Sequence, residues 1–143
     1  MISALSITGC NEPAATSEKT EKDTSSFATK SDTSSMPVYD PALDPLTVGA
    51  QFSKMLSDTL NIKMYEFTMK PGDSVALHAH PDHLVYVLQG GKGLISFNGA
   101  PPQEMELTAG MGFISGHLTD AGKNTGTTTI KLLVADIYRP RVK

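Results

Sequence analysis

The chain has 143 residues, a length typical of one folded domain, and 39% of them are hydrophobic, which is enough for a core. A formal net charge of -3 and the lack of any Lys/Arg run argue against nucleic acid as the main partner. The longest apolar runs, such as residues 84–88 and 132–135, are only as long as strands, so the sequence predicts no transmembrane helix.

The first ten residues resemble the end of a bacterial lipoprotein signal. An apolar start leads into Ile7-Thr8-Gly9-Cys10, and Cys10 is the only cysteine, so it has no partner for an internal disulfide. In a lipobox the cysteine is lipidated, so the resemblance implies a lipid anchor at Cys10 and a place in the cell envelope or periplasm. The preceding nine residues contain no Lys or Arg and are short for a signal peptide. The alternatives are a start further upstream, or a tail with an incidental cysteine on a cytoplasmic protein.

Residues 11–36 are predicted to be a disordered tether. They contain eleven Ser or Thr and a single aromatic residue, Phe27. Such a segment cannot bury enough apolar surface to offset the entropy lost on ordering. A flexible spacer would let a folded domain stand off a membrane. Three prolines, Pro37, Pro41 and Pro45, then predict an extended entry into a domain that spans residues 37–143.

From about residue 47 onward, turn signals separate short strand-like runs every eight to twelve residues, which is typical of an all-β sandwich or barrel. Pro71-Gly72 fits a type II turn, Gly90-Gly91 a hairpin tip, and Asn98-Gly99 a further turn, whereas residues 119–127 are predicted to be a loop. The predicted strands are 51–56, 62–70, 74–80, 83–89, 93–97, 104–107 and 128–138. The sequence therefore predicts a single antiparallel jelly-roll β-barrel behind a disordered tail.

Three of the four histidines, His78, His80 and His83, lie within six residues. Side chains two apart on a strand point to the same side, so His78 and His80 can aim at one point. His83 follows directly after a Pro81-Asp82 corner. Imidazoles that share a target in this way are typical ligands of a divalent metal ion.

The stretch from Gly72 to Gly90 resembles the first motif of the cupin superfamily, G-x5-H-x-H-x3,4-E-x6-G, at both glycines and at His78 and His80. The second motif of that family, G-x5-P-x-G-x2-H-x3-N, more loosely resembles residues 110–124, where its internal proline is missing. The resemblance covers roughly residues 47–139. It implies a small jelly-roll barrel with a metal site inside.

Two positions depart from the family pattern. His83 stands where the first motif has Glu, and Asp120 stands where the second motif has His. The resulting set of His78, His80, His83 and Asp120 keeps three imidazoles and one carboxylate. These donors suit a divalent transition metal such as Fe, Mn, Ni, Cu or Zn. His117, three residues before Asp120, is the alternative fourth ligand.

The strand that follows His83 also predicts a pocket wall. If His83 faces the interior of the barrel, alternation directs Val85 and Val87 inward as well, and they would make the wall dry. Leu84, Tyr86 and Leu88 would then lie on the opposite face.

Two classes of function fit these residues. As an enzyme, the protein would use its metal to polarise a substrate oxygen or to bind O₂. The resemblance to small cupins implies dioxygenase, isomerase or lyase chemistry on a small oxygenated molecule. As a binding module, the domain would hold a metal or a small ligand without catalysis, even with a degenerate metal site. The resemblance also implies a homodimer that pairs through an outer sheet.

Overall fold

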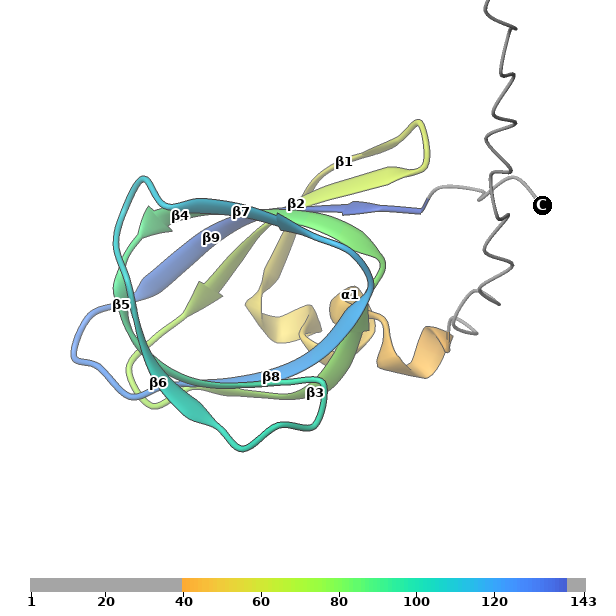
Figure 1. The fold of residues 1–143 in the computed structure, drawn as a ribbon. Coiled ribbons are helices and arrows are strands. Elements are labelled where there is room, and N and C mark those ends of the chain that lie inside the picture. Colours follow the sequence, from red (N-terminus) through yellow and green to blue (C-terminus); the bar gives the residue numbers. More distant parts are fainter. Residues whose placement is uncertain (1–39, 139–143) are drawn as a thin grey trace, which may run out of the picture. The chain divides into compact units, whose positions relative to one another are not determined.

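The computed structural model describes residues 40–138, which form two antiparallel sheets that face each other (Figure 1). One sheet has five strands in the order β1-β2-β9-β4-β7, and the other has four in the order β3-β8-β5-β6. The strands are β1 (Ser53–Thr59), β2 (Ile62–Met69), β3 (Ser74–His80), β4 (Asp82–Gln89), β5 (Gly91–Phe97), β6 (Gln103–Leu107), β7 (Gly112–Ser115), β8 (Leu118–Asn124) and β9 (Ile130–Ile137). The predicted all-β jelly-roll barrel is confirmed.

The predicted lipid anchor at Cys10 and the tether over residues 11–36 lie outside the described residues. Within the described part, no helix is both long and apolar enough to cross a membrane.

Alternating burial along the strands builds the core between the two sheets. On β2, Tyr65, Phe67 and Met69 are buried, and they pack with Val75 and Val134. Side chains two apart on a strand share a face, so β2 directs this whole set inward. A second buried cluster consists of Val87, Leu107 and Ile130.

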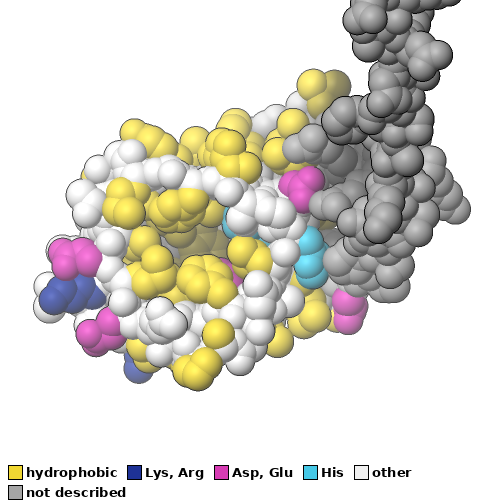
Figure 2. Space-filling view, in the orientation of Figure 1, with side chains coloured by type: hydrophobic (Ala, Val, Ile, Leu, Met, Phe, Trp, Pro, Cys, Tyr) yellow, Lys and Arg dark blue, Asp and Glu magenta, His cyan; other side chains and the backbone are white. Residues whose placement is uncertain are grey.

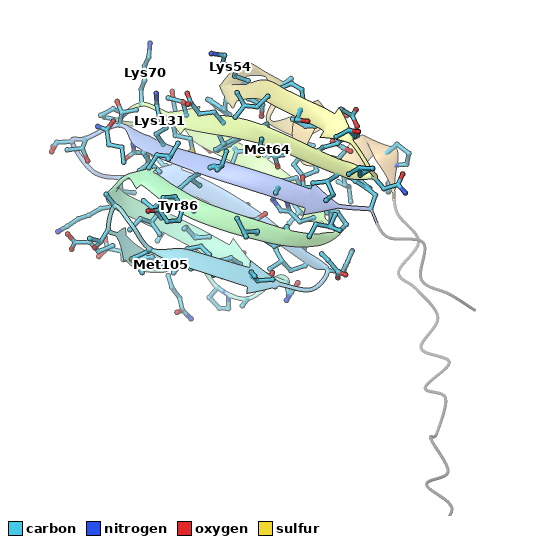
Figure 3. All side chains as sticks on the ribbon, turned by 90° about the horizontal axis from the view of Figure 1, so that it is seen from above. Lys54, Met64, Lys70, Tyr86, Met105 and Lys131 are labelled. Carbon is cyan, nitrogen blue, oxygen red and sulfur yellow. The ribbon has the colours of Figure 1, made fainter. Side chains whose placement is uncertain are left out.

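The outer face of the five-stranded sheet is visible in Figure 3, where Met64, Tyr86 and Lys131 are labelled. Tyr86 is 43% exposed, whereas its neighbour Val87 on β4 is fully buried. This confirms the predicted alternation of β4, with Tyr86 outward. Pairing of two chains through this face stays a prediction.

The sequence predicts an extended entry into the barrel, but the described part of this entry is helical. A 3-10 turn over Pro41–Leu43 precedes the short helix α1 (Pro45–Val48), and a second 3-10 turn covers Ala50–Phe52. Asp40 accepts a hydrogen bond from the backbone N–H of Ala42, and Asp44 accepts one from Leu46. An Asp before Pro is an N-cap followed by a residue whose φ already suits the first turn of a helix. Pro41 and Pro45 therefore begin helical turns, and Pro37 lies outside the described residues.

Gly90-Gly91 is not a hairpin tip, because β4 and β5 belong to different sheets and do not pair. The two glycines instead carry the chain across from one sheet to the other at a point of close packing. A Cβ on Gly90 would lie 2.1 Å from the carbonyl oxygen of Leu107, and one on Gly91 would lie 2.8 Å from Thr128 Oγ1. Only glycine fits this crossover.

We expect Gly90→Ala to lower the free energy of unfolding by about 2–3 kcal/mol, because the new methyl group overlaps backbone that is paired with β5. Gly116→Ala is the matched control, since its Cβ would meet nothing closer than 3.8 Å, and its change should stay within about 0.5 kcal/mol. Urea unfolding of the two variants measures the difference. Equal changes in the two variants would contradict this explanation of Gly90.

The predicted loop over residues 119–127 was wrong, because most of it is strand β8 (Leu118–Asn124). Its sequence, with Asp, Gly, Lys and Asn, has low strand propensity. However, β8 pairs with β3 on one side and β5 on the other, and this pairing overrides the local preference. The short strand β7 was not predicted. The pairing of β8 with β3 places Asp120 directly opposite His78.

Candidate metal site and its cavity

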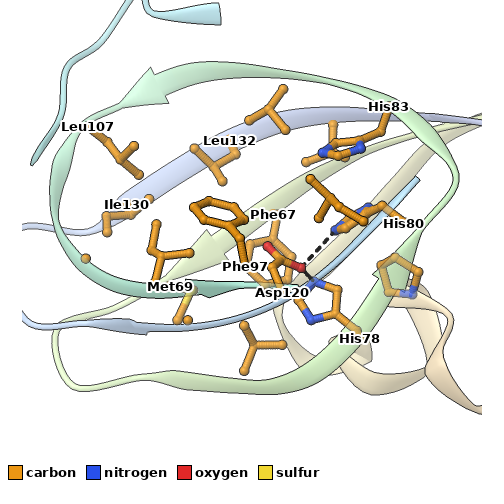
Figure 4. Close-up of a pocket in the computed structure, with 18 of the residues that line it drawn as sticks. Phe67, Met69, His78, His80, His83, Phe97, Leu107, Asp120, Ile130 and Leu132 are labelled. Carbon is orange, nitrogen blue, oxygen red and sulfur yellow. Dashed lines mark ion pairs between the residues drawn. The ribbon is translucent and has the colours of Figure 1, made fainter. Parts of the chain in front are cut away.

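His78 and His80 lie on β3 and point to the same side, as predicted. Both are buried, and their rings meet edge to face with centroids 4.9 Å apart. The neighbouring strand β8 contributes Asp120, whose Oδ1 lies 3.0 Å from His78 Nε2 and 3.6 Å from His80 Nε2 (Figure 4). One ligand atom from each of these three residues lies within 4.8 Å of the other two. We call this group the His/Asp cluster.

Hydrogen bonds to the outer ring nitrogens indicate which nitrogens carry protons. His78 Nδ1 lies 2.8 Å from the carbonyl oxygen of Ala76, and His80 Nδ1 lies 2.8 Å from Asp136 Oδ1. Both partners are acceptors, so each Nδ1 donates its hydrogen, and a neutral ring then has its lone pair on Nε2. The two lone pairs point to the region of Asp120 Oδ1, a buried oxygen with no hydrogen-bond donor within residues 40–138. The cluster thus brings together three electron-pair donors and needs a cation or a proton between them.

The pKa of His78 also indicates that the cluster favours a positive charge between its three ligand atoms. Burial lowers the pKa of His78, but the protonated ring can donate Nε2–H to Asp120 and is stabilised by that negative charge, so the pKa is raised above its ordinary value. For His83, burial and the nearby His80 lower the pKa. In the absence of a metal, a proton on His78 can therefore occupy the place of a cation beside Asp120.

His83 lies beside the cluster but is not part of it. Its ring stacks on His80, with centroids 4.5 Å apart and an interplanar angle of 23°. Its Nδ1 lies 3.2 Å from Ser115 Oγ and 3.3 Å from the carbonyl oxygen of Pro81. The His83 side chain lines the cavity, but its ring nitrogens are not among the ligand atoms that lie within 4.8 Å of one another. Metal binding by His83 stays a prediction.

His117, the alternative fourth ligand, is exposed in the bend between β7 and β8 and does not line the cavity. Of the two candidates, the structure brings Asp120 to the histidines. The pairing of β8 with β3 places Asp120 opposite His78, and the irregularity in this pair lies between Val75 and His78, not beside His117.

Asp136 and Tyr65 were missed in the sequence. Asp136 is fully buried on β9, where Oδ1 accepts from His80 and Oδ2 accepts from the Tyr65 hydroxyl at 2.9 Å. Burial and the charge of Asp136 raise the pKa of Tyr65, so its hydroxyl keeps the proton that it donates. A carboxylate behind a histidine in this way is typical of metal sites. The available signal was a lone acid inside the apolar run of residues 130–137.

A cavity of about 320 Å³ opens from the His/Asp cluster between the two sheets (Figure 2). Val85 lines it as predicted. Val87 does not, because it is fully buried in the second core cluster with Leu107 and Ile130, which themselves line the cavity. Val87 is buried against these two side chains.

No family profile matches the sequence, and neither does any curated protein. Solved structures do match. One is a cupin domain from Bordetella pertussis Tohama I, with 20% identity and a TM-score of 0.53, covering 61% of this chain and 92% of that chain. Another is an RmlC-like cupin family protein with a double-stranded β-helix fold from Methanocaldococcus jannaschii, with 10% identity and a TM-score of 0.50, covering 59% of this chain and 77% of that chain. At such identities, the likeness concerns the fold.

Proposed function

We propose, starting from the cupin fold of this chain, that the His/Asp cluster holds one divalent transition-metal ion and presents it to a small oxygen-bearing molecule. The observation that carries the proposal is Asp120 Oδ1, a buried oxygen that faces two imidazole nitrogens and has no hydrogen-bond donor among the described residues. A buried charge without a partner is costly, and a cation among these three atoms would satisfy all of them.

The residues present fit such an ion. His78 and His80 would bind it through Nε2, and Asp120 would bind it through a carboxylate oxygen. The carbonyl of Ala76 and the carboxylate of Asp136 hold the two rings in the required tautomer and orientation. Two imidazoles and one carboxylate with open positions form the donor set of non-haem Fe(II) oxygenases, and the same donors suit Mn, Ni, Cu and Zn.

When bound, the ion would supply a Lewis acid that polarises an oxygen of the substrate. The chain itself contributes a cavity that shields the bound molecule from bulk water. Three protein donors leave positions for substrate, which supports an enzyme of the dioxygenase, isomerase or lyase type. Metal binding without turnover of any oxygenated substrate would support the alternative, a non-catalytic binding module.

Metal content tests the proposal directly. The purified full chain, stripped with chelator and dialysed against Zn²⁺ or, without oxygen, against Fe²⁺, should take up close to one ion per chain by elemental analysis. If the chain bound none of the candidate divalent metals, the proposed metal site would be contradicted. The lipid anchor at Cys10, the envelope location and the homodimer are independent of this test and stay proposals.

Metal affinity should fall as the solution is acidified. The pKa of His78 is raised, so the metal-free cluster binds a proton more tightly than free imidazole does, and the metal must displace that proton. The loss should therefore begin above the ordinary histidine pKa of about 6.5 and approach tenfold in apparent affinity per pH unit below the raised value. Titrations from about pH 8.5 down to 5.5 measure this, and His117→Gln should follow the wild-type profile. An affinity that is independent of pH over this range would contradict it.

A further inference from the structure

The polar groups of the cavity lie at one end. His78, His80, His83 and Asp120 lie together, whereas Met69, Leu107 and Ile130 line the other end (Figure 4). Apart from the His/Asp cluster, its neighbours His83 and Ser115, and Tyr65, whose hydroxyl is bonded to Asp136, the side chains that face this space from the described strands are apolar. A molecule in the cavity thus meets hydrogen-bonding groups at one end only.

The cavity also offers no second site for a charged group. Lys123 is the only Lys or Arg among the lining residues of the described part. It follows Gly122 on β8, so alternation directs its side chain to the outer face, where it is exposed. A dicarboxylate, a sugar or a phosphate ester would therefore bury polar groups without partners, which lowers affinity.

Two aromatic residues extend the apolar wall to the solvent. Phe97 on β5 and Phe113 on β7 come from opposite sheets, line the cavity, and are 39% and 41% exposed. Figure 2 shows hydrophobic side chains around the hollow. An apolar ligand would gain contact with both rings as it enters.

We propose that the cavity binds a neutral, mainly apolar molecule with a single oxygen function, whose alkyl or aromatic body fills the apolar end while its oxygen meets the His/Asp cluster. This deepens the proposed function, and only the oxygen contact rests on it. The volume of about 320 Å³ is at the small end of ligand cavities, which limits the body to a short chain or one ring.

A series of straight-chain methyl ketones tests the ligand class. Butanone, hexanone and octanone, titrated calorimetrically into the metal-loaded full chain, should bind about three- to fourfold more tightly with each added methylene until the cavity is full. Oxalate and pyruvate should bind more weakly than octanone. An affinity that does not change with chain length, or tighter binding of oxalate, would overturn the proposal.

Neighbouring residues on β7 provide a matched pair of variants. Phe113→Ala should weaken octanone binding about three- to tenfold, because it removes aromatic contact at the cavity. Ile114→Ala should leave it unchanged, since Ile114 is 76% exposed and does not line the cavity. Equal effects of the two substitutions would overturn the assignment.

The same series on chelator-treated protein distinguishes this proposal from the metal site. The dependence on chain length should persist without metal, because it arises from the apolar end. If the protein binds metal and the chain-length dependence is missing, the ligand class is wrong and the metal site stands. If the dependence is present and no metal binds, the ligand class stands and the metal proposal fails.

Discussion

Asp120→Ala should lower the affinity for divalent metal by more than the 10- to 100-fold that is typical for loss of an outer-shell partner. The substitution removes the only carboxylate whose oxygen lies within reach of both His78 Nε2 and His80 Nε2 in the described structure. The two imidazoles that remain are neutral donors, so the cation also loses the negative charge that balances it. Competition with a chromophoric chelator measures the affinity of variant and wild type.

His117→Ala is the matched control for this experiment. It removes the other candidate ligand, which is exposed and lies outside the cavity, so the metal affinity should stay at the wild-type value. An unchanged affinity in Asp120→Ala would end the idea that the carboxylate replaces the family histidine. A loss in His117→Ala alone would assign the fourth position to His117.

The part of the site that depends on local pattern could be predicted from sequence. β3 spans Ser74–His80, as predicted, because turn residues stand on both sides of this short run. The preceding Gly72 has a φ of 87°, which suits the second central residue of a type II turn. Once the strand is known, the separation of two residues fixes His78 and His80 on one face.

Strands and contacts that depend on residues far apart in the sequence could not be predicted from local patterns. β8 becomes a strand only because it pairs with β3 and β5, and its own residues favour a loop. Asp136 lies 56 positions from His80, and no local pattern indicates that β9 brings the two together. Val87 is buried as expected, but its place is in a cluster with Leu107 and Ile130 from other strands and not in the cavity wall.

Asp136→Ala should be the most destabilising of these substitutions, with a loss of about 3–5 kcal/mol in the free energy of unfolding. The carboxylate is fully buried and accepts hydrogen bonds from both His80 and Tyr65. Its removal leaves the imidazole N–H and the phenol hydroxyl buried without acceptors, each at a cost of about 1–3 kcal/mol. Urea unfolding of the metal-free protein measures this loss.

Two conservative variants separate the structural role of Asp136 from its role in positioning His80. Tyr65→Phe removes one hydroxyl and leaves the bond between Asp136 and His80, so it should cost about 1 kcal/mol of stability and leave the metal affinity unchanged. Asp136→Asn keeps the size of the side chain but loses the charge that holds the His80 ring, so metal affinity should fall about 10- to 100-fold. If Tyr65→Phe weakened metal binding as much as Asp136→Asn did, Asp136 would act only through the packing of the core. A loss confined to Asp136→Asn would show that the carboxylate on β9 orients the imidazole on β3, which links a fully buried carboxylate of the barrel to its candidate metal site.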